Sequence, residues 1–325
     1  MADKVIAVLG ATGQQGGGLV RAILGDSTGG FSVRAITRDP GKDAARTLAS
    51  GGADVVQADL DDAASLERAF AGAHGLYAVT NFWEHYFREP DTSAEREKAQ
   101  AKNIADAARR AGVQHVIWST LEDTRPLMAP DDTRMPFLQG HYRVPHFDAK
   151  HEANAFFEGL PVTLLYTSFY WDNLITFGTA PKRGDDGTYA WAFPMGDRRL
   201  AGIAAEDIGK VAWGIFKADR EYIGRSVGIA GEFLTIDEMG RTLSKVLGVG
   251  PIRYDAIEPD AYRALGFPSA DEMGNMFQMY RDFESAVLGR RSIEAARALN
   301  PELQTFEQWA SARRDDLLAA MTGKS

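Results

Sequence analysis

The sequence contains no cysteine, and this absence removes several kinds of chemistry at once. None of the 325 residues can form a disulfide, act as a thiolate nucleophile or bind zinc through sulfur. A chain without cysteine is compatible with a reducing compartment. A chain of this length buries about three quarters of its unfolded surface on folding, so its core needs no covalent cross-link.

Long apolar runs and an excess of positive charge are also missing. No segment approaches the ~20 apolar residues of a membrane-spanning helix, and no signal peptide precedes the strand predicted from Lys4. The 36 basic and 45 acidic residues give a formal charge of −9, which opposes non-specific binding to nucleic-acid phosphates. These features predict a soluble, cytoplasmic protein without direct contact to membrane or nucleic acid. A homodimer is compatible with them.

Strand and helix patterns alternate through the first half of the chain. Lys4–Leu9 is a short apolar run ending in glycine, as in a strand covered on both faces of a parallel sheet. Further strands are predicted over residues 31–37, 54–57, 74–80, 113–119 and 162–166. Helices are predicted near residues 19–24, from Pro40, and over 63–71, 93–110 and 146–157. This alternation predicts an α/β fold with a doubly wound, Rossmann-type parallel sheet.

The pattern is less regular after residue 120. Residues 121–145 form a long segment rich in Pro, Asp and Arg, of the kind found as a lid, a binding loop or a disordered insert. Further on, helices are predicted over residues 206–217 and 235–247, and strands over 227–230 and 252–257. We therefore expect a dinucleotide-binding domain over residues 1–170. A smaller mixed or helical subdomain should occupy residues 171–325, with some segments returning to the sheet.

A glycine-rich loop joins the first predicted strand to the first predicted helix. Its residues are Gly10, Ala11, Thr12, Gly13, Gln14, Gln15 and Gly16. Glycines here permit a tight turn and close approach of the backbone to a pyrophosphate, while free amides at the helix start favour its charge. The spacing is GxxGxxG and not GxGxxG, and a glycine triplet alone also occurs in purely structural turns. Because a strand and a helix flank this one, it predicts a bound dinucleotide.

The residues after the second strand bear on the choice of cofactor. An NAD site usually has an acidic residue there, which holds the ribose 2′-hydroxyl. This chain has Arg38, with Lys42 four residues later, and both cations can meet the 2′-phosphate of NADP(H). Asp39 argues weakly for NAD, and two solvated surface cations are the alternative interpretation. We predict NADP(H).

Two more strands end in residues that should face the same ligand, because ligands of open α/β sheets bind at the carboxyl ends of the strands. Asp59 and Leu60 follow the third strand, at the expected edge of an adenine pocket. Asp59 is equally suited to starting the next helix. Thr80, Asn81 and Phe82 follow the fourth strand. We predict that these residues lie near the cofactor.

These motifs, with others further along the chain, resemble the NmrA-like family of atypical short-chain dehydrogenases/reductases. The similarity covers nearly the whole chain and includes Thr37–Pro40, Gln57–Asp62, Val79–Glu84, His146–Lys150, Phe169–Leu174 and Leu265–Pro268. It is closest to the branch with a human NADPH-sensing member. The resemblance implies that Lys150 reaches the nicotinamide ribose, and that Tyr170, Trp171 and Asn173 line the nicotinamide end. Residues 121–145 form a longer segment than that branch leads us to expect.

The proton-donating residue of the superfamily is absent. Standard members use YxxxK, and the matching residues here are His146 and Lys150. Tyr142 lies about two helical turns before Lys150 and cannot replace the missing tyrosine. His146, one turn before the lysine, is a competent proton donor, although a histidine at a helix start can equally have no chemical role. The candidate catalytic residues are therefore Lys150 and His146.

Two other side-chain groups near this segment have less support. His141, His146 and His151 are five residues apart, which places them about 140° apart around a helix, so we predict no metal site. Ser119 and Thr120 end the fifth strand, where the superfamily keeps a catalytic serine. They can orient a substrate carbonyl, or they can cap the next turn.

Two functions remain open. In the first, an NADP(H)-binding redox sensor transmits cofactor state to a regulatory protein partner; the missing tyrosine and the family branch favour it, and we lean towards it. In the second, a reductase acts on a small apolar quinone, imine or carbonyl compound. Lys150, the long segment and an aromatic group favour the reductase, although such groups are more often core. The aromatic group is Phe169, Tyr170, Trp171, Trp191 and Phe193. Direct DNA recognition is third, because no basic recognition helix is present.

Overall fold

A computed structural model describes residues 4–323 of the chain. Its largest element is a seven-stranded sheet in which all neighbouring strands pair in parallel. The strands are β1 (Lys4–Val8), β2 (Phe31–Thr37), β3 (Asp54–Gln57), β4 (Gly75–Ala78), β5 (His115–Thr120), β6 (Val162–Tyr166) and β11 (Ser226–Gly228). Their order is β11-β6-β5-β4-β1-β2-β3, so the strand order reverses between β1 and β4. The predicted doubly wound α/β sheet is confirmed.

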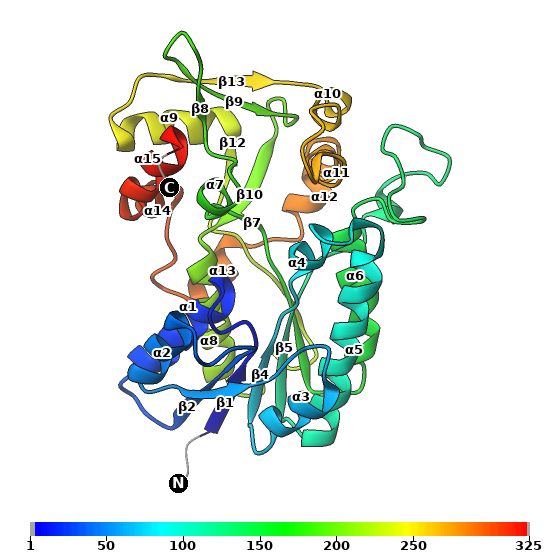
Figure 1. Ribbon diagram of the computed structural model, residues 1–325, viewed down its shortest axis with the longest axis vertical. Coiled ribbons are helices and arrows are strands. Elements are labelled where there is room, and N and C mark those ends of the chain that lie inside the picture. The colour runs from blue at the N-terminus through cyan, green and yellow to red at the C-terminus, as the bar shows by residue number, and fades with distance from the viewer. Residues whose placement is uncertain (1–3, 324–325) are drawn as a thin grey trace.

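Helices cover both faces of this sheet (Figure 1). One face carries α1 (Gln14–Gly25), α2 (Asp43–Ser50), α8 (Ala205–Lys217) and α13 (Ile293–Leu299). The other carries α3 (Ala63–Phe70), α5 (Ser93–Ala111), α6 (Pro145–Ala153) and the 3₁₀ turn η3 (Asn154–Phe157). Strand β11 and helices α8 and α13 come from beyond residue 170, so the second half of the chain returns to the large sheet.

Each face of the large sheet has its own hydrophobic core, because successive side chains of a strand point to opposite faces. Ile6 and Val8 of β1 pack under α1 and α8, whereas Ala7 and Leu9 pack under α3 and α5. Both faces of the strand are therefore buried, as its unbroken apolar run predicts.

Helices α1 and α8 approach each other closely because glycines face across the contact. A Cβ on Gly18 would lie 2.6 Å from the carbonyl oxygen of Glu206, and one on Gly209 would lie 2.2 Å from the amide of Leu19. Side chains at these positions would collide with backbone, which cannot move aside as a side chain can. Helix α1 is the helix that the sequence predicts to bind phosphate. Its position is thus fixed by α8, which belongs to the second half of the chain.

The second part of the molecule lies above the large sheet in Figure 1 and contains two small sheets. The first has the order β12-β10-β7 and the second β13-β9-β8. Their strands are β7 (Phe169–Tyr170), β8 (Lys182–Arg183), β9 (Tyr189–Phe193), β10 (Arg199–Ile203), β12 (Glu232–Thr235) and β13 (Ile252–Ala256). The helices here are α7 (Asn173–Thr176), α9 (Ile236–Leu247), α10 (Pro259–Arg263), α11 (Ala270–Asp282), α12 (Glu284–Leu288), α14 (Phe306–Ala312) and α15 (Arg314–Thr322).

A third core fills this part and absorbs most of the aromatic group noted in the sequence. Trp171 packs against Phe306 and Trp309, and Phe193 packs against Phe277 at 5.0 Å between ring centroids. Phe169 and Trp191 belong to the same core. Tyr170, the one residue of the five with a hydroxyl, contributes that group to the polar network described below. Most of these side chains therefore belong to a hydrophobic core, which is the interpretation that the sequence favours.

The segment over residues 121–145 is ordered around one buried carboxylate. Asp148 on α6 accepts hydrogen bonds from the amide and hydroxyl of Thr124, at 2.8 and 2.7 Å, and from the amides of Arg143 and Val144. The segment contains the 3₁₀ turn η2 (Arg125–Leu127). Residues 121–145 therefore form an ordered segment in the structure, and not a disordered insert.

Two further details complete the fold. Helix α2 begins at Asp43 with Lys42 as its N-cap, so the expectation of a helix from Pro40 is wrong. The reason is that the Asp39 carboxylate accepts the amide of Gly41 and folds that stretch into a turn. Among the described helices, none combines the length and apolar composition needed to cross a bilayer. The predicted absence of a signal peptide rests partly on residues 1–3, which lie outside the described range, as do residues 324–325.

Candidate functional site

The glycine-rich loop leaves the start of α1 without a side-chain cap. Gly10 takes a positive φ of 60°, and its carbonyl accepts the amide of Gly13 at 2.8 Å. Gly13 is the N-cap of α1 and offers no side chain to the first amides of the helix. A Cβ on Gly16 would lie 2.4 Å from the Gly10 carbonyl oxygen. The loop is therefore tightly folded, and the free amides of the helix start suit an anion.

Two glutamines of the first turn of α1 connect this loop to distant segments. The Gln14 side-chain amide donates to the Thr176 hydroxyl of α7 at 3.2 Å. The Gln15 carbonyl oxygen accepts from the hydroxyls of Tyr77 and Ser119, and its amide donates to the Tyr170 hydroxyl. Residues near the ends of β4, β5 and β7 thus meet at Gln15.

Burial dominates the acidity of the two tyrosines in this network. It raises the pKa of Tyr77, which has no exposed surface. It also raises the pKa of Tyr170 to about 12, against a smaller lowering by the Thr167 hydroxyl. Both phenols are therefore neutral hydrogen-bonding groups at neutral pH.

The end of β2 presents cations, and an acidic residue already meets one of them. The Arg38 guanidinium lies 2.5 Å from the Glu84 carboxylate of α4 (Phe82–Tyr86), and this hydrogen bond raises the pKa of Arg38. The Arg38 side chain is 60% exposed. Lys42 is exposed nearby, at the start of α2. An anion bound here would compete with Glu84 for Arg38.

The residues after β3 hold local structure. The Asp59 carboxylate accepts the amide of Asp61 at 3.0 Å, and the amide of Asp59 donates to the Ser65 hydroxyl. Asp62 is the N-cap of α3, so the helix-starting role weighed for Asp59 falls to Asp62. The carbonyl of Leu60 accepts the side-chain amide of Asn103.

Lys150 is held in a nearly buried ion pair that the sequence analysis did not foresee. Its Nζ lies 2.7 Å from the Thr80 hydroxyl and 2.9 Å from the Glu97 carboxylate, and Thr80 also donates to Glu97. Glu97 has no exposed surface. Lys150 and Thr80, separated by 70 residues, were both predicted site residues. The structure brings them together and adds a counter-ion to the lysine.

The other residues at this end are placed differently. Asn81 is exposed at the start of α4, whereas Phe82 is 2% exposed and packs against His146. Asn173 begins α7, and its carbonyl accepts the Thr179 hydroxyl. The Trp171 side chain lies in the third core, against Phe306 and Trp309.

His146 is paired with a carboxylate from the second part of the molecule. Its Nδ1 contacts Glu272 of α11, and its backbone amide donates to the same oxygen at 3.0 Å. Burial raises the pKa of Glu272, against the lowering effect of His146. The hydroxyl of Thr120 contacts the carbonyl of Lys150 and the side chain of Asn154, which is a structural role, whereas Ser119 belongs to the Gln15 network.

Three glutamates were missed, and only one left a signal in the sequence. Glu97 interrupts an otherwise apolar stripe of α5 formed by Ala94, Ala101 and Ile104, and a charge there indicates a buried partner. Glu84 and Glu272 follow no comparable pattern. Glu272 is 126 residues from His146, and this distance hides the pair from any local reading.

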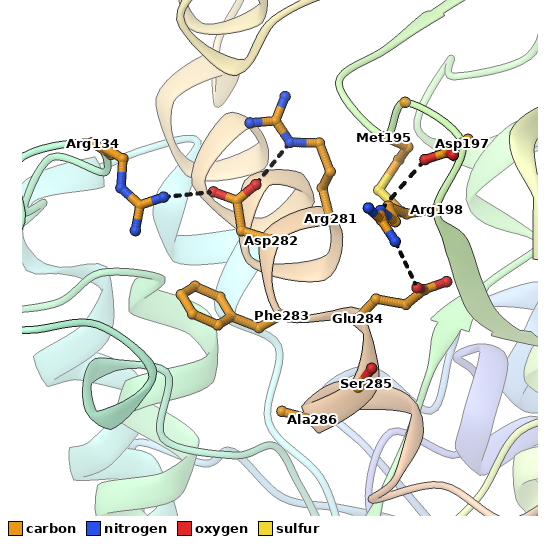
Figure 2. Close-up of a pocket in the computed structure, with 11 residues that line it drawn as sticks. Arg134, Met195, Asp197, Arg198, Arg281, Asp282, Phe283, Glu284, Ser285 and Ala286 are labelled. Carbon is orange, nitrogen blue, oxygen red and sulfur yellow. Dashed lines mark hydrogen bonds and ion pairs between the residues drawn. The ribbon is translucent and has the colours of Figure 1, made fainter.

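A cavity of about 690 Å³ lies elsewhere, between the 121–145 segment and the second part (Figure 2). Arg134 and Arg281 both meet Asp282, at 3.9 and 2.9 Å, and Arg198 meets Glu284 at 3.5 Å. None of the predicted site residues lines this cavity. Because its arginines are paired with carboxylates, we place the candidate site at the sheet edge, where the predicted residues converge.

The strand order and the glycine-rich loop define a Rossmann-type protein, and comparison with known proteins gives its family. The sequence profile of the NmrA-like family matches residues 2–310. A relative from Cladobotryum sp, the NmrA-like family domain-containing oxidoreductase FrzB, is 31% identical over 288 residues, which cover 84% of this chain and 82% of the relative. The chain belongs to the NmrA-like family.

Solved structures share the fold. NmrA, a negative transcriptional regulator, in complex with NADP superposes with a TM-score of 0.74 at 24% identity, covering 96% of this chain and 95% of that one. Citrobacter sp. triphenylmethane reductase complexed with NADP(H) has a TM-score of 0.70 at 18% identity, covering 96% and 100%. At such identities the likeness concerns architecture.

Proposed function

We propose that this chain binds NADP(H) along the carboxyl edge of the large sheet and uses it to reduce a small apolar substrate. The observation that carries the proposal is the uncapped start of α1 behind Gly10–Gly16, at the point where the strand order reverses between β1 and β4. Free amides at a helix start and a switch in strand order are the two features that a pyrophosphate site needs.

The side chains around this point fit the rest of the cofactor. Arg38 and Lys42 are exposed at the end of β2, where they can meet a 2′-phosphate. Lys150 is paired with Glu97 and oriented by Thr80, so that it can donate to ribose hydroxyls. Gln15 holds Ser119 and Tyr170 together beneath the predicted nicotinamide end. A bound nicotinamide would supply the hydride chemistry.

Reduction is favoured by the aromatic side chains beside Lys150 and by relatives such as FrzB, which is named as an oxidoreductase. Phe82 and Trp83 pack against His146, one helical turn from the lysine. Such a surface can exclude water from a reacting carbon.

A redox sensor is the second candidate, and one observation favours it. In the sequence, His146 stands four residues before Lys150, where the YxxxK pattern has tyrosine, and its Nδ1 contacts Glu272. NmrA, which has the same architecture, is named as a transcriptional regulator. A sensor would bind NADP(H) and pass its state to a protein partner.

The test has two stages. NADPH and NADH are first titrated against the protein by nucleotide fluorescence, and we expect tighter binding of NADPH. The NADPH complex is then mixed with quinones, imines, aldehydes and ketones while near-UV absorbance is followed. Turnover that Lys150→Ala abolishes supports the reductase. Tight binding without turnover of any acceptor supports the sensor, and absence of binding refutes both.

A further inference from the structure

Five aromatic side chains form a cluster where α4 faces α7. They are Phe82, Trp83, Tyr86, Phe87 and Phe177, called the aromatic cluster below. Trp83 is central, with ring centroids 5.4 Å from Tyr86 and 5.6 Å from Phe177. Phe87 is 53% exposed and Phe177 is 38% exposed. The cluster therefore presents exposed aromatic surface, of the kind that binding sites use.

The aromatic cluster lies beside the candidate cofactor site. Phe82 follows Thr80 by two residues, and Thr80 contacts Lys150. On the opposite side, Phe177 follows α7, whose Thr176 meets Gln14 of the glycine-rich loop. A planar molecule on Trp83 and Phe177 would lie between the two halves of the chain, close to the predicted nicotinamide end.

Carboxylates lie close to the aromatic cluster. Trp83 packs against His146 at 5.1 Å between ring centroids, and His146 contacts Glu272. Glu272 has no exposed surface, and within residues 4–323 its second carboxylate oxygen has no hydrogen-bond partner. Burial, with the carboxylates of Glu272, Asp271 and Asp91, raises the pKa of Tyr86 to about 12. Aromatic faces beside carboxylates are a surface that attracts organic cations.

Two of the cations near this surface are paired with carboxylates, and a third, Arg88, lies 3.9 Å from Glu84. Lys150 is paired with the buried Glu97, and Arg38 is paired with Glu84. Neither Lys150 nor Arg38 therefore presents an unpaired positive charge to a cationic ligand on the aromatic cluster.

Several proton donors at the same place are already hydrogen-bonded within the protein. The hydroxyl protons of Tyr77 and Ser119 both go to the Gln15 side-chain oxygen. The Tyr170 hydroxyl lies within that network, and the Nδ1 of His146 faces Glu272. A neutral ketone or quinone needs a proton as its oxygen gains charge. A substrate that is already a cation needs none.

We propose that the aromatic cluster binds a cationic aromatic iminium ion as the hydride acceptor of this protein, an inference that rests on the reductase function proposed above. A hydride from the reduced nicotinamide adds to the iminium carbon and forms a C–H bond. The π pair of the C=N bond moves onto nitrogen and becomes the lone pair of a neutral amine. The iminium gains two electrons, the dihydronicotinamide loses two and becomes NADP⁺, and no proton is consumed.

Binding is tested first, without cofactor or turnover. N-methylisoquinolinium and 2-methylnaphthalene have the same shape and differ in charge, and equilibrium dialysis gives the affinity of the protein for each. We expect the cation to bind at least tenfold more tightly. Glu272→Gln should remove most of this preference and leave 2-methylnaphthalene unchanged. Equal affinity for the two molecules would overturn the proposal.

A surface variant keeps the test independent of the buried pair. Phe177→Leu keeps an apolar side chain but removes a π face, so cation affinity should fall about fivefold. Phe267→Leu is the matched control, because Phe267 is also 38% exposed but its ring neighbour is Tyr262. If Phe177→Leu instead changes only the oligomeric state, the aromatic cluster is an interface between copies and the proposal fails.

Turnover is tested with N-methyl-3,4-dihydroisoquinolinium, a permanent iminium cation, and with 1-tetralone, a neutral ketone of similar shape. NADPH fluorescence reports cofactor binding in the same samples. We expect NADPH to be oxidised by the iminium and not by the ketone. Bound NADPH without iminium reduction would refute this inference alone, whereas absence of NADPH binding would refute the proposed function itself.

Discussion

The candidate site has two ends that are built in opposite ways. The β2–β3 end, with Arg38, Lys42 and Asp59, is largely exposed, and Asp59 bonds to a residue two positions away. The β4–β7 end, with Lys150 and His146, is buried and relies on partners from other elements. The first end can exchange its partners for a ligand at little cost, because exposed charges are solvated. The second is preorganised, because each buried charge already has a counter-ion.

The strongest test of this difference is a double-mutant cycle at the β4–β7 end. Lys150→Met leaves the fully buried carboxylate of Glu97 without its cation, so the free energy of unfolding should fall by about 3–5 kcal/mol. Adding Glu97→Gln removes the stranded charge and should restore most of this loss. Urea denaturation of the two single variants and the double variant measures the coupling. Additive losses would mean that the pair is not a unit.

Gly16→Ala tests the glycine-rich loop, which lies between the two ends of the site. The new Cβ would meet the Gly10 carbonyl 2.4 Å away, and backbone cannot yield as a side chain can, so we expect a loss of about 3 kcal/mol in unfolding free energy. NADPH binding should be lost with it. Gly25→Ala on the same helix is the control, because a Cβ there meets nothing within 4 Å. Alanine has the higher helix propensity, so Gly25→Ala should lose no stability; a similar loss in both variants would mean that the clash with Gly10 is not the cause.

The β2–β3 end should respond in binding and not in stability. Arg38→Ala is expected to weaken NADPH binding about 10- to 100-fold, through loss of a charge-assisted hydrogen bond, and to leave NADH binding nearly unchanged. Glu84→Gln should act in the opposite direction and strengthen NADPH binding a few-fold, because Glu84 competes for Arg38. Titration of both nucleotides against each variant decides this. Equal losses for NADPH and NADH in Arg38→Ala would remove its assigned role.

The smallest effect is expected from Glu152, which ties α6 to its surroundings. Burial alone would raise its pKa, but hydrogen bonds from Lys98 and Arg125 prevail and lower the pKa from 4.5 to about 2. The stabilisation is therefore fully present above pH 4.5 and is lost as the pH falls towards 2. Glu152→Gln should lower the unfolding free energy by about 1 kcal/mol at neutral pH. The gap to the unsubstituted protein should close in acid, and a gap independent of pH would exclude this linkage.

The same contrast explains how much could be predicted from the sequence. The strands of the large sheet, the glycine-rich loop and Arg38 follow from local rules, because apolar runs, turns and strand ends lie within a few residues. The pairing of His146 with Glu272 and of Gln15 with Tyr170 spans 126 and 155 residues. Such contacts arise only once the strand order and the second part are in place. The packing of Trp171 against Phe306 and Trp309, far along the chain, could not be predicted from its motif either.

The contact between α1 and α8 has a consequence for how the protein is made. A ribosome releases α1 early, but the helix that covers it ends at Lys217, and β11 follows only at residues 226–228. Until then Leu19, Val20 and Ile23 have no partner from α8. A chain synthesised only as far as residue 170 therefore still lacks the helix that covers α1. The predicted phosphate-binding helix reaches its final packing only after more than half of the chain has been synthesised.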